Sequence, residues 1–271
     1  ITSQVTLALA EDIGSGDITA QLIPADETIK ATVITREEAV LCGCDWVKEV
    51  FKQLDADVEI VWHAKEGEQL IANQKIFSLS GNARSILTGE RCALNFVQSL
   101  SYTASVAREY AQLVKDTKLT VLDTRKTIPG WRIAQKYAVT VGGAQNHRVG
   151  LYDAFLIKEN HIMAAGSINK AISQAKNIAP GKTIEVETEN LDEVKEAVEA
   201  GANIIMLDNF SLTMMKEAVD TYGHQGKFEA SGNMTKQDLV AVAETGVDYV
   251  SVGAVTKHVQ AVDLSLRVIK D

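Results

Sequence analysis

Cationic side chains gather in one segment of an acidic chain. Residues 122–161 hold six of them: Arg125, Lys126, Arg132, Lys136, Arg148 and Lys158. The segment has three acidic residues, so its formal charge is +3, whereas the whole chain of 271 residues carries −9. Arginine presents a planar fork of donors that fits a carboxylate or phosphate, and lysine presents a point charge. The segment therefore predicts either a solvated basic face or a binding site for a small anion.

Two cationic pairs and one isolated lysine favour the anion site. Arg125 and Lys126 follow the apolar run "LTVLD", and His147 and Arg148 follow a flexible Gly-Gly pair. A single histidine is more often a satisfied core residue, but here a second cationic pair stands in the same polar region. Lys158 ends the apolar run "AFLI", where a buried ammonium needs a partner. We therefore take these five residues as candidate anion ligands.

Acidic residues and glycines end the later apolar runs. Glu187 follows "IEV" and Asp208 follows "IML". These carboxylates could hold Mg²⁺, accept hydrogen bonds from hydroxyl groups or serve as acid and base; the alternative is a pair of salt bridges to nearby lysines. Ser231, Gly232 and Gly253 lie in "EASGN" and "VSVGA", where glycine lets backbone N–H groups approach a phosphate.

The elements that carry these residues recur along the chain from about residue 118. Short β-branched runs alternate with amphipathic stretches typical of helices. One position in each run marks a strand, and successive positions are separated by 34, 29, 21, 23 and 21 residues: Asp123, Ile157, Val186, Leu207, Ala230 and Ser251. This spacing predicts repeated βα units forming a barrel or near-barrel with its site at the carboxyl ends of the strands. A doubly wound open sheet is the alternative.

The first 117 residues have a different pattern. Residues 28–43 and 56–70 predict antiparallel strands on either side of a helix at 44–54, and a strand from residue 76 leads into a long helix. The last ten residues alternate apolar and polar, as in a strand that returns to this part. We expect an α/β chain with an α+β domain at 1–117, a barrel domain at 118–258 and a C-terminal segment at 259–271 that packs on the first domain.

Composition narrows the class of protein. A pI near 5.2 argues against nucleic-acid binding, which depends on neutralising phosphates. No apolar run approaches the roughly 20 residues needed to span a bilayer, and the start of the sequence lacks the features of a signal peptide. The three cysteines, Cys42, Cys44 and Cys92, cannot all pair in disulfides, so we expect free thiols and a cytoplasmic location. From the lack of a long apolar run we expect no membrane partner.

Long, ordered motifs in this sequence resemble one family. They are "DTRKTIPGWR", "KYAVTVGGAQNHRVGLYDAFLIKENHI", "EVETEN", "IIMLDNF", "EASGNMT" and "VSVGAVTKHVQAVDLSL", and upstream "GERCALNF" and "EDIGSGDIT". They look like the signatures of quinolinate phosphoribosyltransferase, also called nicotinate-nucleotide pyrophosphorylase (carboxylating), and cover nearly the whole chain. The resemblance implies an N-terminal α/β sandwich, an incomplete TIM-like α/β barrel and a homodimer.

The resemblance also implies a reaction and roles for the candidate residues. Quinolinate and phosphoribosyl pyrophosphate, with Mg²⁺, would give nicotinate mononucleotide, pyrophosphate and CO₂ in de novo NAD biosynthesis. Three sets of residues are implied. The quinolinate ligands would be Arg91 (from the partner subunit), Arg125, His147, Arg148 and Lys158. The ligands of phosphoribosyl pyrophosphate would be Lys126, Lys158, Glu187, Asp208, Ser231, Gly232 and Gly253. The catalytic residues would be Lys126, Glu187 and Asp208, with the last two also holding the metal.

Three alternative functions remain open. A phosphoribosyltransferase of the same architecture could use nicotinate and release no CO₂, although a monocarboxylate needs fewer cations. The stretch "HAKEGEQLIANQKIFSLSG" has a strand-turn pattern like that of biotinyl or lipoyl carrier domains, but it lacks a suitably placed lysine. The third alternative is a noncatalytic phosphate-binding barrel, against which the acid pair Glu187 and Asp208 argues.

Overall fold

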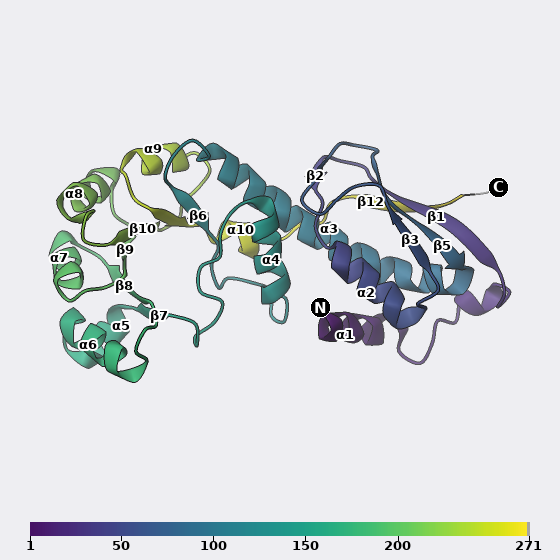
Figure 1. Cartoon of the computed structure of the whole chain (residues 1–271), viewed down its shortest axis with the longest axis horizontal. Helices are drawn as coiled ribbons and strands as arrows, with labels where there is room; N and C mark the ends of the chain where they lie inside the picture. The colour runs from purple at the N-terminus through teal and green to yellow at the C-terminus, as the bar shows by residue number, and fades with distance from the viewer. Residues whose placement is uncertain (270–271) are drawn as a thin grey trace. The chain divides into compact units, whose positions relative to one another are not determined.

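The computed structural model describes residues 1–269, which form two compact units (Figure 1). Among the described residues, unit 1 comprises 1–108, 128–143 and 257–269, and unit 2 comprises 109–127 and 144–256. Within the described residues, no helix is both long and apolar enough to cross a membrane.

Unit 1 is built on a four-stranded sheet in the order β12-β1-β5-β3, in which all neighbouring strands are antiparallel. Its strands are β1 (Thr28–Thr35), β3 (Glu59–Trp62), β5 (Lys75–Asn82) and β12 (Leu264–Ile269), and β2 (Ala39–Val40) pairs separately with β4 (Gln69–Leu70). Its helices are α1 (Thr2–Ile13), α2 (Cys44–Leu54), α4 (Arg132–Gly142) and the first part of α3 (Ala83–Leu113), with a 3₁₀ turn at Ala20–Leu22. The predicted strand–helix–strand order is confirmed, and so is the returning C-terminal strand, which pairs with β1 from Lys30↔Ile269 to Thr35↔Leu264.

The core of unit 1 lies between this sheet and its helices. Val33 and Phe77 of the sheet are buried in one cluster with Val47 of α2 and Phe96 of α3. The amphipathic pattern of α2 explains its position, since its apolar side chains face this cluster while Lys48 and Lys52 are exposed. Cys42, Cys44 and Cys92 are buried and free, as expected.

Unit 2 contains a parallel six-stranded sheet in the order β6-β11-β10-β9-β8-β7. Its strands are β6 (Thr120–Leu122), β7 (Phe155–Ile157), β8 (Ile184–Thr188), β9 (Ile204–Asp208), β10 (Lys227–Ser231) and β11 (Tyr249–Ser251). Its helices are α5 (Glu159–Ala165), α6 (Ile168–Ile178), α7 (Leu191–Glu199), α8 (Leu212–Tyr222), α9 (Leu239–Glu244) and α10 (Ala254–Lys257), which ends one residue into unit 1. Figure 1 shows α6, α7 and α8 following one another along the outer side of the strands.

The strand order supports an incomplete barrel. Strands β7 to β11 neighbour one another in chain order, and the first strand, β6, pairs with the last, β11. A doubly wound sheet would instead reverse its strand order at a switch point. A closed barrel would pair β6 with β7, but in this sheet both are edge strands. The sheet therefore curves as a barrel does and stays open at one place.

The segment between β6 and β7 explains the opening. We expected residues 118–258 to form one continuous domain, but residues 128–143 belong to unit 1, and the boundaries fall at 109 and 257. Helix α4 packs closely on α3 within unit 1: Nε of Arg108 donates to the carbonyl of Gly142 at 2.7 Å, and a Cβ at Gly142 would lie 2.4 Å from the carbonyl oxygen of Ala104. The helix that would follow β6 in a complete barrel thus packs within unit 1.

Candidate functional site

The carboxyl ends of the unit 2 strands surround a pocket of about 550 Å³. Nine of the eleven residues expected in the site line it: Arg125, Lys126, His147, Arg148, Lys158, Glu187, Asp208, Ser231 and Gly232. Seven of them stand at or just after the carboxyl end of a strand, because parallel strands direct their carboxyl ends to the same edge of a sheet, whereas His147 and Arg148 lie between α4 and β7. The strand positions read from the sequence therefore account for seven of the nine residues.

Two arginines stand close enough to repel each other in this pocket. Burial lowers the pKa of Arg148, and the positive charge of Arg125 lowers it further. The Nε atom of Arg125 is buried and, among the described residues, has no hydrogen-bond partner. Buried donors are normally paired, and a carboxylate accepts from such a fork while neutralising the repulsion. The pair is therefore suited to an anion.

Lys158 and Glu187 form an ion pair across neighbouring strand ends. Nζ of Lys158 contacts Oε2 of Glu187, so the partner that a lysine at this strand end requires is present. The backbone N–H of Lys158 donates to Nδ1 of His161 at 3.0 Å, which ties the lysine to the first turn of α5. This contact is also the salt bridge that the sequence offered as the alternative role for Glu187.

Lys126 is fixed through its backbone. Its N–H donates to Oγ1 of Thr124 at 3.1 Å, and its carbonyl accepts from Oγ1 of Thr256 at 2.9 Å. A Cβ at Gly253 would lie 3.1 Å from Cδ of Lys126. Gly253 borders Lys126 and is not among the residues that line the pocket, so its expected role in binding a phosphate stays a prediction.

Asp208 and the glycine loop are joined by Asn209. Nδ2 of Asn209 donates to Oδ2 of Asp208 at 3.1 Å, and its backbone N–H donates to the carbonyl of Ser231 at 3.0 Å. Asn209 has φ +56°, and Gly232 has φ +145°. A Cβ at Gly232 would approach Oδ1 of Asn209 to 3.0 Å, so both backbone angle and contact favour glycine there.

The two carboxylates Glu187 and Asp208 fit a hard divalent cation. Lys158 uses Oε2 of Glu187 and Asn209 uses Oδ2 of Asp208, and each carboxylate has a second oxygen that can face a metal. Mg²⁺ is typically bound by one or two carboxylates together with waters and the phosphates of a substrate. The donor set therefore suits Mg²⁺ bound jointly with a phosphorylated ligand.

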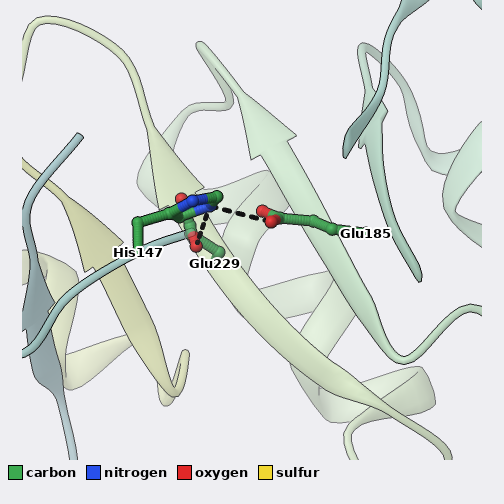
Figure 2. A group of neighbouring side chains, drawn as sticks. All are labelled: His147, Glu185 and Glu229. Atoms are coloured by element: carbon green, nitrogen blue, oxygen red, sulfur yellow. Dashed lines mark ion pairs between the residues drawn. The ribbon is translucent and has the colours of Figure 1, made fainter. Parts of the chain in front are cut away.

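A second cluster consists of His147, Glu185 and Glu229 (Figure 2). Nε2 of His147 is 2.8 Å from Oε2 of Glu185 and 3.6 Å from Oε2 of Glu229. Glu185 and Glu229 are both buried, and among the described residues these three offer ligand atoms that all lie within 4.8 Å of one another. Nδ1 of His147 accepts from the backbone N–H of Arg148 at 2.8 Å. Both ring nitrogens thus contact the protein, and His147 also lines the pocket, so its contact with the substrate stays a prediction.

Sequence reasoning missed Glu185, Glu229 and Asn209. Glu185 and Glu229 stand inside the apolar runs "TIEVE" and "KFEAS", and an acid within a buried strand is a signal that could have found them. Their pairing could not be read, because it depends on the register in which β8, β9 and β10 align. Arg91 lies exposed on α3 in unit 1 and is not among the pocket's lining residues.

Comparisons with known proteins agree with this architecture. The C-terminal domain of quinolinate phosphoribosyl transferase matches residues 103–267, and its N-terminal domain matches residues 17–101. A Synechocystis protein named "Probable nicotinate-nucleotide pyrophosphorylase (carboxylating)" is 42% identical over 97% of this chain and 90% of its own length. A Nicotiana glauca protein named "Quinolinate phosphoribosyltransferase (decarboxylating) 2, mitochondrial" is 35% identical over 97% of this chain and 80% of its own.

A solved structure extends the likeness to three dimensions. The nicotinate-nucleotide pyrophosphorylase from Francisella tularensis matches with a TM-score of 0.96 at 52% identity, over 99% of this chain and 95% of that one. Both family models, the full-length relatives and the shared fold point the same way. The chain belongs to the quinolinate phosphoribosyl transferase family.

Proposed function

We propose that this chain transfers the phosphoribosyl group of phosphoribosyl pyrophosphate to quinolinate and releases CO₂, giving nicotinate mononucleotide and pyrophosphate in NAD biosynthesis. One observation carries the proposal: Arg125, with a buried and unpaired Nε among the described residues, stands beside Arg148 in the pocket that also contains Glu187 and Asp208. Cations for a dicarboxylate and anions for a ribose and its metal thus meet at one edge of the sheet.

The quinolinate end of the site is cationic. We assign the two ring carboxylates to Arg125, Arg148 and Lys158, with His147 behind Arg148 and an Arg91 supplied by a second copy of the chain. A bidentate arginine fixes the angle of a carboxylate as well as its position, which orients the ring nitrogen toward the sugar. Nicotinate has one carboxylate, so the paired arginines favour the dicarboxylate.

The phosphoribosyl end combines acids, lysine and backbone. Glu187 and Asp208 would hold the ribose hydroxyls and Mg²⁺, which neutralises charge on the departing pyrophosphate. Lys126 and Lys158 would contact the pyrophosphate, and the backbone around Ser231 and Gly232 would accept the 5′-phosphate, with Gly253 supporting Lys126.

These positions suit a reaction in two steps. The ring nitrogen forms a bond to the anomeric carbon while the bond from that carbon to pyrophosphate breaks. The carboxylate next to the nitrogen then leaves as CO₂, its bonding electrons remain on the ring, where the quaternised nitrogen stabilises them, and a proton replaces it. Glu187 and Asp208 stabilise the positive charge that develops on the sugar, so catalysis rests on positioning and electrostatics.

We further propose that the active form is a homodimer in which Arg91 completes the neighbouring site. In support, β7 is an edge strand of the sheet. Large apolar side chains on both sides of it in sequence are exposed to solvent: Leu151 at 73% and Tyr152 at 77% before β7, and Met163 at 73% in α5. Mixing Arg91→Ala with Lys126→Ala subunits tests the sharing. Recovered activity supports it, and activity no greater than the sum of the two variants counts against it.

The free, buried thiols suit a reducing compartment, and we propose the cytoplasm as the location.

The deciding experiment incubates the protein with quinolinate labelled in the 2-carboxylate, phosphoribosyl pyrophosphate and Mg²⁺. Equal amounts of labelled CO₂ and nicotinate mononucleotide are expected. If mononucleotide forms from nicotinate and not from quinolinate, the proposed substrate is wrong and the proposed phosphoribosyl transfer still holds. The variant Glu187→Gln separates an enzyme from a binding protein. An enzyme should lose most of its turnover, whereas a protein that only binds phosphate should keep nearly all of its affinity.

A further inference from the structure

Asn209 has a backbone conformation that residues with a side chain rarely adopt. Among the described residues other than glycine, only Asn73 and Asn209 have a positive φ, +68° and +56° respectively. This left-handed region is sterically costly for any residue with a Cβ, although asparagine tolerates it better than most. Asn73 lies in the turn between β4 and β5, where asparagine often takes such an angle. Asn209 instead follows β9 and lines the pocket, so its strained angle points to a function.

Packing explains the turn at Asn209 but not the choice of residue. Leu207 in β9 and Phe210 are both buried, at 0% and 6%, whereas Asn209 between them is exposed. A left-handed residue turns the chain sharply at this point, so that Phe210 reaches the core before α8 begins at Leu212. Glycine would make the same turn without strain. The asparagine side chain must therefore contribute something that the turn alone does not require.

Asn209 joins two neighbouring strand ends at the pocket. Its Nδ2 donates to Oδ2 of Asp208 at 3.1 Å, and its backbone N–H donates to the carbonyl of Ser231 at 3.0 Å. Asp208 and Ser231 are partners in the register of β9 and β10. A Cβ at Gly232 would lie 3.0 Å from Oδ1 of Asn209, so the glycine loop packs directly on the same amide. One residue thus contacts the acid that ends β9 and the glycine loop that follows β10.

We propose that Asn209 is a positioning residue for the phosphoribosyl end of the site: its amide orients the carboxylate of Asp208, and its left-handed backbone ties that carboxylate to Ser231 and Gly232. The proposal rests on the proposed function in taking Asp208 as a ribose ligand and the glycine loop as the phosphate ligand. The hydroxyls and the 5′-phosphate of one sugar are joined by a ring of fixed size, so their ligands must keep a fixed separation. A carboxylate that is already oriented also loses less entropy when it binds.

Three substitutions separate the amide from the backbone angle. Asn209→Gly keeps the left-handed angle and removes only the side chain, whereas Asn209→Ala also strains the angle. Asn209→Asp keeps the size of the side chain but replaces the amide donor by a carboxylate, which repels Asp208. Asn209→Gly should lower kcat/KM for phosphoribosyl pyrophosphate about 10-fold or more, because a hydrogen bond to a charged group is lost, and Asn209→Asp should lower it further. KM for quinolinate should change by less than about threefold, because the amide contacts the phosphoribosyl end.

Asn73 provides the matched control, because it is the same residue type at a similar backbone angle in unit 1. Asn73→Ala and Asn209→Ala should each lower the melting temperature, since alanine is strained at a positive φ, and Asn73→Gly and Asn209→Gly should lower it less. Kinetic losses should follow the substitutions at Asn209 alone. Equal kinetic losses at both positions would attribute the effect to destabilisation and overturn the positioning role.

Calorimetric binding of ribose 5-phosphate separates this proposal from the proposed function, because it requires neither quinolinate nor turnover. If the wild type does not convert quinolinate but binds ribose 5-phosphate more tightly than Asn209→Gly does, the proposed function fails and the positioning role stands. If the wild type converts quinolinate, and Asn209→Gly and Asn209→Asp both keep its kcat/KM for phosphoribosyl pyrophosphate, the positioning role is wrong and the proposed function stands. A wild type that neither converts quinolinate nor binds ribose 5-phosphate would overturn both.

Discussion

Replacing Arg125 by lysine isolates the contribution of its planar fork. The lysine keeps a positive charge beside Arg148, so the repulsion that contributes to the lowered pKa of Arg148 remains. The substitution removes the buried Nε of Arg125, which has no hydrogen-bond partner among the described residues. We propose that this Nε donates a hydrogen bond to a quinolinate carboxylate. A hydrogen bond to a charged group contributes about 1.5–3 kcal/mol, which corresponds to a loss of about 10- to 150-fold in kcat/KM.

The assay follows nicotinate mononucleotide at varied quinolinate and saturating phosphoribosyl pyrophosphate, and then with the two roles exchanged. The loss should appear in kcat/KM for quinolinate, while the value for phosphoribosyl pyrophosphate changes less. Arg36→Lys is the matched control, because Arg36 forms an exposed 3.9 Å ion pair with Asp263 in unit 1. A variant within about threefold of the wild type for quinolinate would refute the bidentate contact, and equal losses for both substrates with a lowered melting temperature would indicate misfolding instead.

Three further predictions concern other parts of the chain. Burial raises the pKa of Cys42 and Cys44 and raises that of Cys92 to about 11, so iodoacetamide at pH 7.5 should leave all three unmodified in the native protein and alkylate them in urea, as read by mass spectrometry. Burial raises the pKa of Glu229 from 4.5 to about 8, so the folded protein binds this proton more tightly than the unfolded chain does. The contribution to stability is therefore full below pH 4.5 and is lost as the pH rises toward about 8. The melting temperature of the wild type, relative to that of Glu229→Gln, should fall over this range, and a constant difference would contradict the raised pKa. Gly142→Ala would place a Cβ 2.4 Å from the carbonyl oxygen of Ala104, so overpacking should destabilise unit 1 by about 1–3 kcal/mol in urea unfolding, whereas the exposed Thr140→Ala should change stability by less than about 1 kcal/mol.

Much of the candidate site could be predicted from the sequence. Six apolar runs ended in Arg125, Lys158, Glu187, Asp208, Ser231 and Gly253, and the structure places five of these in one pocket. The physical reason is general: in parallel βα units every strand directs its carboxyl end to the same edge, so residues that follow strands converge whatever their separation along the chain. The acidic partner of Lys158 could also be anticipated, although the sequence predicted a buried ammonium and the structure leaves this side chain 47% exposed.

Tertiary structure decided what periodicity could not encode. Helix α4 has a pattern that suits a barrel helix, yet it packs on α3 because Gly142 permits close approach to Ala104, and the sheet stays open between β6 and β7. Register brings Glu185 and Glu229 together next to His147, so this expected substrate ligand also contacts two buried carboxyl groups. Sequence by itself predicted most of the charged residues at the strand ends that line the site, because the strand ends follow from local periodicity. Only the folded chain determined their partners and protonation, because these depend on distances between segments and on burial.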